Sequence, residues 1–387
     1  MQKLRIAQIS PYWFDVPPKN YGGTERVISY ITEELVSRGH NVSLYAPPGS
    51  QTNARLISPL SAEYPKAVES YIDPFFSGNS LYVNAEVFKQ ADEFDIIHSH
   101  AYYFSFPFSE FVKTPVVHTL HNQLPREREI ENLFMRRYKD LNFVSISQEF
   151  RTHFDLNYVS TVYHGLDLEF FPFNEVGGDY LFWMGRVSKN KGEDIAIEVA
   201  QKVKRKLKMA ASIRKDTADR FKKIIDSSSE YLEVLQNVKF EETWKHYGGA
   251  RSFIFPVQWR EPFGLILIES MACGTPVIAY AKGSIPEIIK DGETGFIVNP
   301  SDAEIVGDWI VKKTGIEGLC EAVEKVYSLP DQDYLRMRKN CRSHVEKNFT
   351  VKQMVDKYEE VYAKILNPKF KMVRQARHPE QSRRTNP

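Results

Sequence analysis

The sequence of 387 residues has few cysteines, no long apolar run and almost no net charge. The number and spacing of Cys273, Cys320 and Cys341 suit neither a disulfide framework nor a metal site, so we expect reduced thiols. No stretch approaches the roughly 18 apolar residues that a membrane-spanning helix needs, and the amino terminus lacks the features of a secretory signal. These absences favour a cytoplasmic protein and leave peripheral contact with the inner face of a membrane open.

An excess of charge of one sign is also missing. Lysine and arginine number 51 against 50 aspartates and glutamates, which excludes a broad basic surface, and we expect no nucleic-acid partner. Aromatic residues make up 13% of the chain and can build a substantial core, which argues against an acidic disordered protein. Residues 368–387 differ, with six basic side chains, one acidic side chain and three prolines, and we expect a disordered tail there.

The length predicts two domains or one large one, at about 150 residues per domain. Short apolar runs alternate with helical patterns, which is typical of parallel α/β sheets. In the first half we expect strands at residues 4–10, 42–45, 95–98, 116–120 and 143–146, and helices at 24–38, 84–91 and 126–138. In the second half we expect strands at 180–184, 207–213, 252–256, 276–280 and 295–298, and helices at 194–203, 217–225 and 265–271.

Pro172, Gly177 and Gly178 interrupt this alternation and mark a domain boundary. We predict two Rossmann-like, doubly wound domains, at residues 1–172 and 173–349, which face each other across a cleft. A helix at about 350–366 follows and could pack back on the first domain. A cleft between two domains is a preferred place for a ligand.

Gly22 and Gly23 lie between the first strand and the first helix. Two glycines let a ligand approach the main chain closely, and the free amides of the following helix favour phosphate. An ordinary turn explains the same pair equally well. The sequence has neither the Rossmann glycine triplet nor a phosphate-binding loop with its Lys and Ser or Thr, which disfavours a nicotinamide oxidoreductase and a P-loop enzyme.

Arg186 ends the first strand of the second half, and Lys191 precedes its first helix. Side chains at the carboxyl ends of parallel strands project into the binding crevice of an open sheet. There Arg186 and Lys191 could meet a diphosphate, one as a planar fork and the other as a compact charge. A solvated basic loop is the alternative, but the position at a strand end favours a binding role.

Glu261 and Glu269 lie eight positions apart, with Gly264 where a helix begins. Their carboxylates could accept hydrogen bonds from ribose and hexose hydroxyls at the two ends of one extended ligand. The backbone amides of Phe263, Gly264 and Leu265 would face a phosphate between them. Taken alone, such a pair is better explained as a capping acid and a surface acid.

The residues that follow decide between these interpretations. After 261–269 the chain reads SMACGTPV at 270–277, GSIPE at 283–287 and DGETGF at 291–296. With these motifs the sequence resembles the family 4 glycosyltransferases, retaining enzymes of the GT-B fold. The resemblance covers residues 6 to about 362 and is strongest at 261–298. The run from Pro17 to Arg26 matches a bacterial branch of the family, whose acceptors it does not identify.

The resemblance implies transfer of a hexosyl group from a nucleotide-diphosphate sugar to a hydroxyl of a glycan, lipid-linked or small-molecule acceptor. Arg186 and Lys191 match the basic pair that neutralises the donor diphosphate. Glu261 matches the glutamate near the donor sugar, and Glu269 matches the one on the nucleotide ribose. We expect no cofactor and no metal, because the two cations can do the work of a divalent ion.

The resemblance also assigns residues of the first half. Gly23 matches the loop that approaches the phosphates, and His121 matches the histidine beside the transferred sugar. His100 matches less firmly, and His98 is better explained as a packed strand residue. The family favours front-face substitution, in which the departing phosphate oxygen takes the acceptor proton and His121 orients the sugar.

Two segments bear on substrate and metal. Residues 210–215 stand where family members often have a glycine-rich turn, so the nucleotide base is not predicted, and Arg214 or Lys215 could add a contact there. Asp331 and Asp333 have the spacing of a metal-dependent transferase motif but lie far from the strand ends, so chance explains them better.

Other classes fit parts of the pattern. A sugar-nucleotide epimerase can use the same fold, and a non-catalytic carbohydrate-binding protein would not need the two cations. The stretch from Arg126 to Lys139 is basic and amphipathic and could contact anionic lipid. The acidic residues Glu127, Glu129 and Glu131 favour a solvated helix there instead. Nothing in the sequence indicates an oligomeric state.

Overall fold

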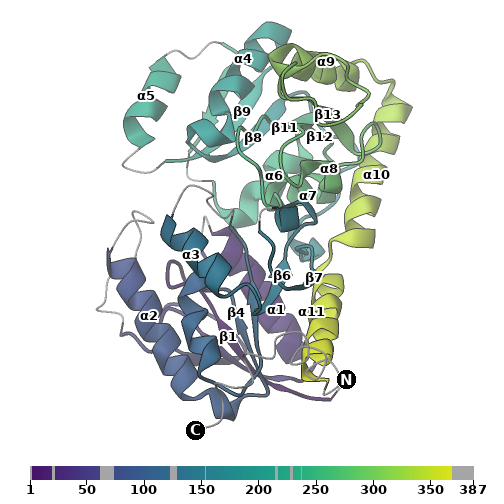
Figure 1. Cartoon of the computed structure of the whole chain (residues 1–387). Coiled ribbons are helices and arrows are strands. Elements are labelled where there is room, and N and C mark those ends of the chain that lie inside the picture. Colours follow the sequence, from purple (N-terminus) through teal and green to yellow (C-terminus); the bar gives the residue numbers. More distant parts are fainter. Residues whose placement is uncertain are drawn as a thin grey trace.

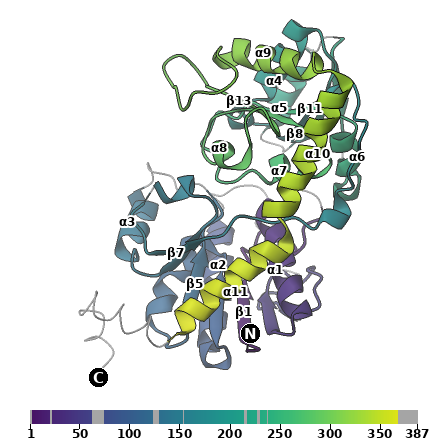
Figure 2. The same cartoon turned by 90° about the vertical axis from the view of Figure 1, so that its right-hand side faces the viewer.

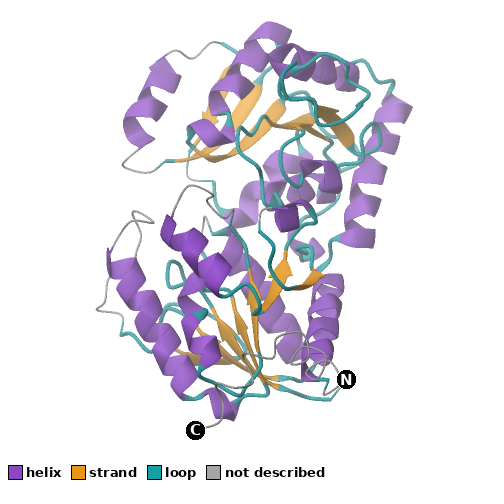
Figure 3. Ribbon diagram, in the orientation of Figure 1, coloured by secondary structure: helices purple, strands orange, loops and turns teal. Residues whose placement is uncertain are grey.

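The chain folds into two α/β domains stacked end to end (Figure 1). The computed structural model describes residues 2–19, 22–61, 74–122, 129–152, 154–213, 217–226, 230–236 and 238–367. Each domain holds one sheet whose strands all run parallel, with helices on both faces (Figure 3). The predicted fold class is therefore confirmed.

The first sheet has the strand order β3-β2-β1-β4-β5-β6-β7. Its strands are β1 (Arg5–Ile9), β2 (Asn41–Tyr45), β3 (Arg55–Ile57), β4 (Ile96–Ser99), β5 (Val116–Thr119), β6 (Asn142–Ser145) and β7 (Tyr158–Thr161). The helices of this domain are α1 (Gly23–Ser37), α2 (Pro74–Lys89) and α3 (Glu129–Arg137).

Side chains of the first sheet alternate between two cores, because successive residues of a strand point to opposite faces. Ile6 of β1 packs in a cluster with Val27 and Ile31 of α1. Its neighbours on the strand, Ala7 and Ile9, pack in another cluster that includes residues of α2. Both faces of the sheet are thus buried, which explains why its strands read as short, continuous apolar runs.

The second sheet has the order β10-β9-β8-β11-β12-β13. Its strands are β8 (Leu181–Arg186), β9 (Leu207–Ser212), β10 (Leu232–Leu235), β11 (Ser252–Phe255), β12 (Val277–Tyr280) and β13 (Gly295–Val298). The helices that follow β8 and later strands are α4 (Glu193–Val203), α5 (Ala218–Asp226), α6 (Thr243–Gly248), α7 (Leu265–Ala272), α8 (Ile285–Ile288) and α9 (Gly315–Tyr327).

The last two helices run along the edge of both domains (Figure 2). Helix α10 (Asp331–Asn348) packs against α7 of the second domain, and α11 (Val351–Leu366) packs against α1 of the first. The change of domain takes place at Phe349 and Thr350, between the two helices. Thr350 accepts a hydrogen bond from the backbone N–H of Gln353, which caps the start of α11.

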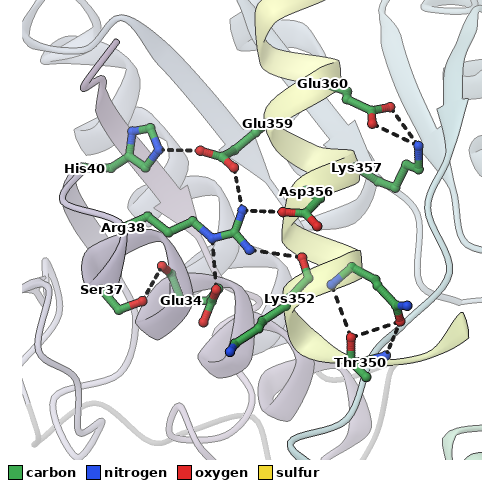
Figure 4. A network of polar contacts seen from close by, with 11 residues as sticks. Glu34, Ser37, Arg38, His40, Thr350, Lys352, Asp356, Lys357, Glu359 and Glu360 are labelled. Atoms are coloured by element: carbon green, nitrogen blue, oxygen red, sulfur yellow. Dashed lines mark hydrogen bonds and ion pairs between the residues drawn. The ribbon is translucent and has the colours of Figure 1, made fainter. Parts of the chain in front are cut away.

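An arginine holds α11 to the first domain. Arg38, just after α1, reaches Asp356 and Glu359 of α11 at 2.6 and 2.5 Å and Glu34 of its own helix at 2.9 Å (Figure 4). The ring of His40 adds a contact of 2.9 Å with Glu359. The apolar residues of α11 lie in the same buried cluster as Ile6 and Val27. The carboxyl-terminal helix is therefore an integral part of the first domain.

Most of the expected elements are present within one to three residues of their predicted ends. Three short strands, β3, β7 and β10, were not predicted, and the helix expected at 84–91 begins at Pro74 and ends at Lys89. The first sheet ends at Thr161 and the second begins at Leu181, on either side of the predicted boundary. The predicted tail at 368–387 lies outside the described residues.

Two further observations concern the helices and the cysteines. None of the helices formed by the described residues is long and apolar enough to cross a membrane. Cys273, Cys320 and Cys341 are all free and buried.

Candidate active site

The strand order of each sheet reverses at one point. In the first sheet β1 lies between β2 and β4, and in the second β8 lies between β9 and β11. Ligands of open parallel sheets bind beyond the carboxyl ends of the strands at such a reversal. The predicted site residues follow these strands: Gly22 and Gly23 come after β1, Arg186 ends β8, and Glu261 comes after β11.

The glycine loop of the first domain adjoins the start of α7 in the second domain. Gly22 has a φ of 148°, and a Cβ atom placed on it would lie 2.8 Å from the side chain of Pro18. Gly264 has a φ of 89°, in the left-handed region that favours glycine, and α7 starts directly after it. A Cβ on Gly23 would lie 3.3 Å from Cδ1 of Leu265. The amino-terminal ends of α1 and α7 therefore meet at the domain interface.

Lys191 and Glu261 form an ion pair on the second-domain side. Lys191 Nζ lies 2.9 Å from Glu261 Oε2, and the side chains are only 13% and 10% exposed. The indole N–H of Trp259 donates to the same oxygen at 2.9 Å, and the ammonium of Lys191 lies 4.7 Å from the centre of that indole. The pair is thus held in place by an aromatic neighbour. Arg186 lies at the end of β8 and is partly buried.

Glu269 is buried within α7 and accepts a hydrogen bond of 2.9 Å from the hydroxyl of Tyr247. Burial raises the pKa of Glu269, while the Tyr247 hydrogen bond and the charge of Arg26 act in the opposite direction. Arg26 belongs to α1 of the first domain, and its guanidinium stacks 3.4 Å from the ring centre of Phe240, in the second domain. Charges from both domains therefore meet around Glu269.

His121 lies just beyond β5, inside a buried group of histidines. Its Nε2 is 2.7 Å from Nδ1 of His100, and His100 Nε2 is 2.8 Å from Oε1 of Gln8. Burial lowers the pKa of His121 to about 3 and the pKa of His100 well below its usual value, so both rings are neutral near pH 7. His121 Nδ1 is buried and has no hydrogen-bond partner among the residues that the structure describes.

The histidine group reaches the second domain through ring contacts. His121 stacks on His164, with ring centres 5.2 Å apart, and His164 meets Phe263 edge-on at 4.8 Å. Phe263 precedes Gly264, so these contacts connect the predicted sugar side with the start of α7. The buried clusters support this connection, because Leu120 and Phe263 belong to one apolar core that spans both domains.

Polar contacts also join the two domains near Phe263 and the start of α7. Glu287 of α8 accepts hydrogen bonds from the backbone N–H groups of Gln148 and Glu149, at 2.8 and 2.6 Å, and from the hydroxyl of Tyr163 at 2.8 Å. The hydroxyl of Ser147 donates to the carbonyl of Pro262 at 2.8 Å. These contacts fix the segment before Gly264 against the first domain.

Another acid lies behind the glycines. Glu25, in the first turn of α1, is buried, and its Oε1 has no hydrogen-bond partner within the described part of the chain. Burial raises the pKa of Glu25 to about 7. A Cβ on Gly22 would lie 3.0 Å from Glu25 Oε2, so this carboxyl group directly adjoins the loop.

Contacts thus connect several of the predicted residues: Gly23 with Leu265, His121 through His164 with Phe263, and Lys191 with Glu261. His121 and the glycine loop come from the first domain, and Arg186, Lys191, Glu261, Phe263, Gly264, Leu265 and Glu269 come from the second. Sequence reasoning missed Trp259, Tyr247, Arg26 and His164. Trp259 stands two residues before Glu261 and could have been found, whereas Tyr247 and His164 reach the site by contacts between distant elements.

The metal candidates do not form a site. Among the described residues, no group of three or more His, Cys, Asp and Glu side chains is arranged to hold a metal ion. Asp331 and Asp333 lie in the first turn of α10, and Asp333 pairs with Arg336 at 2.8 Å. Arg214 and Lys215 lie outside the described residues.

Comparison with known families agrees with this geometry. A model described as Glycosyltransferase Family 4 matches residues 21–170, and one described as Glycosyl transferases group 1 matches residues 168–344. Together they cover residues 21–344 without a gap. The chain belongs to the family 4 glycosyltransferases.

Relatives and solved structures resemble this glycosyltransferase over most of its length. The D-inositol 3-phosphate glycosyltransferase of Thermobifida fusca is 24% identical over 78% of this chain and 83% of its own. A sucrose-phosphate synthase from Thermosynechococcus elongatus superposes with a TM-score of 0.77 at 18% identity, over 94% of this chain and 99% of its own. Anabaena HepE, solved with UDP and glucose, gives a TM-score of 0.71 at 16% identity, over 93% and 99%.

Proposed function

We propose that this glycosyltransferase moves a hexosyl group from a nucleotide-diphosphate sugar to an acceptor hydroxyl, with retention at the anomeric carbon and without a metal ion. The observation that carries the proposal is the meeting of α1 and α7 at the domain interface, beside the Lys191–Glu261 pair and His121. Backbone amides and a cation next to neutral hydrogen-bonding groups match a diphosphate joined to a sugar. The structure of HepE with UDP-glucose supports a donor of this class.

The diphosphate carries the negative charge that the site must stabilise most. When the bond between the anomeric carbon and the phosphate oxygen breaks, negative charge builds up on the leaving nucleotide. Lys191 is 13% exposed, and its ammonium lies 5.4 Å from the ring centre of Phe255 and 4.7 Å from that of Trp259, where it could stabilise that charge. It is paired with Glu261, so donor binding requires the ammonium to turn from the carboxylate toward phosphate. Glu261 is then left to accept hydrogen bonds from the sugar.

The transfer step needs only groups of the donor and the acceptor. The acceptor oxygen bonds to the anomeric carbon on the face that the phosphate leaves, and its proton passes to the departing phosphate oxygen. His121 is neutral and buried, which suits a group that orients the sugar better than a base that must hold a proton. Glu269 would accept hydrogen bonds from the ribose in place of its present partner, Tyr247.

The proposal is tested with a panel of UDP-, GDP- and ADP-sugars, by measuring release of the nucleoside diphosphate with and without candidate acceptors. The anomeric coupling constant of the product reports retention, and full activity in the presence of a chelator supports metal independence. A sugar-nucleotide epimerase would convert the donor without any acceptor, and a carbohydrate-binding protein would show no turnover. Either result would replace the transferase assignment.

We propose a cytoplasmic location because the three thiols are free and the implied donor is a cytoplasmic metabolite. Glycan, lipid-linked and small-molecule acceptors are distinguished by product analysis. Co-sedimentation of the protein with vesicles that contain anionic lipid tests peripheral contact with the membrane.

A further inference from the structure

A chain of hydrogen bonds leads from His121 to the amino-terminal strand. His121 Nε2 contacts Nδ1 of His100 at 2.7 Å, and His100 Nε2 contacts Oε1 of Gln8, on β1, at 2.8 Å. All three side chains are buried, with His121 the most accessible at 8% exposed. Because these side chains are buried, the order of the protons along these bonds follows from the donor and acceptor character of the protein groups.

Gln8 is itself oriented by α11 and by His98 of β4. Its amide nitrogen donates to the hydroxyl of Tyr362 at 3.3 Å and lies 3.4 Å from Nδ1 of His98. The hydroxyl of Tyr362 lies 2.7 Å from the same His98 Nδ1. His98 Nε2 continues to the hydroxyl of Thr119 at 2.8 Å, which contacts the hydroxyl of Tyr358 at 3.2 Å. Residues more than 350 positions apart in the sequence therefore share one buried network.

Simple donor and acceptor rules order this network. The carboxamide oxygen of Gln8 can only accept, so His100 must carry its proton on Nε2. Burial keeps His100 neutral, so its Nδ1 is an acceptor and receives the Nε2–H of His121. A neutral His121 then has a bare lone pair on Nδ1, the atom that has no partner among the described residues.

The reverse order is less favourable. If Gln8 turned its amide nitrogen toward His100, His100 would accept on Nε2 and carry its proton on Nδ1. His121 would then accept on Nε2 and carry its own proton on Nδ1. That N–H would then be buried without an acceptor in the described part of the chain. A buried N–H without a partner is rarer in proteins and more costly than an unused lone pair.

The helix that carries Tyr362 is firmly held. Arg38 joins three carboxylates of α1 and α11, and His40 joins Glu359, three residues before Tyr362 (Figure 4). Tyr358 and Tyr362 themselves are buried against the first sheet. The Tyr362 hydroxyl is thus fixed in position relative to Gln8, as a group that orients an amide must be.

We propose that Gln8 and Tyr362 are positioning residues that, through His100, fix His121 as its Nε2–H tautomer, so that Nδ1 accepts a hydrogen bond from a hydroxyl of the transferred sugar. The part that concerns the sugar rests on the proposed function, whereas the tautomer does not. Helix α11 thereby contributes to catalysis without contacting the donor.

The tautomer is read directly by NMR. Long-range ¹H–¹⁵N spectra of protein labelled at the imidazole nitrogens show which nitrogen of His121 carries the proton, with His121→Phe assigning the signals. We expect Nε2–H in the unaltered protein. In Gln8→Met the acceptor for His100 is lost, and in Tyr362→Phe the amide nitrogen loses the shorter of its two contacts and keeps only the one with His98. In both variants we expect a signal of the Nδ1–H form of His121 to appear.

Tyr358→Phe is the matched control, because it removes a hydroxyl from the same buried face of α11 at the far end of the network. It should leave the tautomer and kcat unchanged. In Tyr362→Phe and Gln8→Met we expect kcat to fall about tenfold with little change in donor KM, which corresponds to one lost hydrogen bond in the transition state.

Several results would overturn the proposal. An Nδ1–H signal for His121 in the unaltered protein would reverse the proton order, and an unchanged tautomer in both variants would remove Gln8 and Tyr362 from their role. A changed tautomer with normal kcat would show that Nδ1 does not serve the sugar. If the unaltered protein transfers no sugar at all, the proposed function fails, and the spectra still decide the tautomer.

Discussion

The two sides of the domain interface handle charge in opposite ways. On the first-domain side, burial keeps His98, His100 and His121 neutral, and they contact one another and Gln8. On the second-domain side, Lys191 and Glu261 form an ion pair of 2.9 Å beside Trp259. Neutral hydrogen-bonding groups suit a sugar, and a cation that can change partner suits a diphosphate. In the proposed function, the sugar and the diphosphate of one ligand therefore contact two differently built surfaces.

The largest effect should come from the charged side. We expect Lys191→Ala to lower kcat/KM by about 100-fold or more, because it removes a cation that stabilises the leaving diphosphate. Lys189→Ala is the control, since this exposed lysine belongs to the same short 3₁₀ helix (Lys189–Lys191). Steady-state kinetics with the active donor measure both variants. Equal effects of the two substitutions would mean that the positive charge of the loop matters and the position of Lys191 does not.

The neutral side should respond less strongly. His121→Phe keeps a ring that can stack on His164 and removes both nitrogen atoms, so we expect kcat to fall about tenfold. His118→Phe serves as the control, because His118 contacts Ser105 and Ser109 within the first domain. If His121→Phe lowered activity as much as Lys191→Ala, His121 would do more than orient the sugar. The proposed difference between the two sides of the interface would then be wrong.

A smaller change is expected at Glu269. Glu269→Gln replaces one of two acceptor oxygens with a donor, so we expect the Kd of the nucleoside diphosphate to rise roughly five- to tenfold. Tyr247→Phe leaves the carboxylate in place and removes its present hydrogen-bond donor. Isothermal titration calorimetry compares the variants. If Glu269→Gln binds the nucleoside diphosphate with unchanged affinity, Glu269 does not contact the ribose.

The smallest effect concerns stability and pH. The pKa of Glu25 rises from 4.5 to about 7 on folding, so between these values the folded state binds more protons than the unfolded state. The free energy of unfolding therefore falls as the pH rises from about 4.5 to 7. We expect Glu25→Gln to remove this dependence and to be more stable than the unaltered protein by about 1 kcal/mol at pH 8. Chemical denaturation at pH 5 and pH 8 measures the difference, and parallel pH profiles for the two proteins would contradict it.

The charged side was easier to predict from the sequence than the neutral side. The residues of the charged side lie at the ends of strands or just before the first turn of a helix: Arg186, Lys191, Glu261 and Gly264. Local sequence patterns predict both strand ends and helix starts. The family resemblance supplied the role of His121, but nothing local links it to Gln8 or Tyr362. The contacts of Tyr362 with Gln8 and His98 span 354 and 264 positions of the sequence, and they depend on α11 returning to the first sheet and on side-chain geometry inside a core. Strands such as β3 and β7 were missed because they are short and partly polar at the sheet edge.

In the proposed function, the second-domain side binds the diphosphate through Lys191. Calorimetry with UDP, GDP and ADP, each compared with its nucleoside, tests it most directly, because the difference isolates the contribution of the phosphates. We predict that the preferred diphosphate binds the unaltered protein at least about tenfold more tightly than its nucleoside, and that Lys191→Ala loses most of this preference. If Lys191→Ala keeps the full preference, the diphosphate does not bind through Lys191 and the proposed site is wrong.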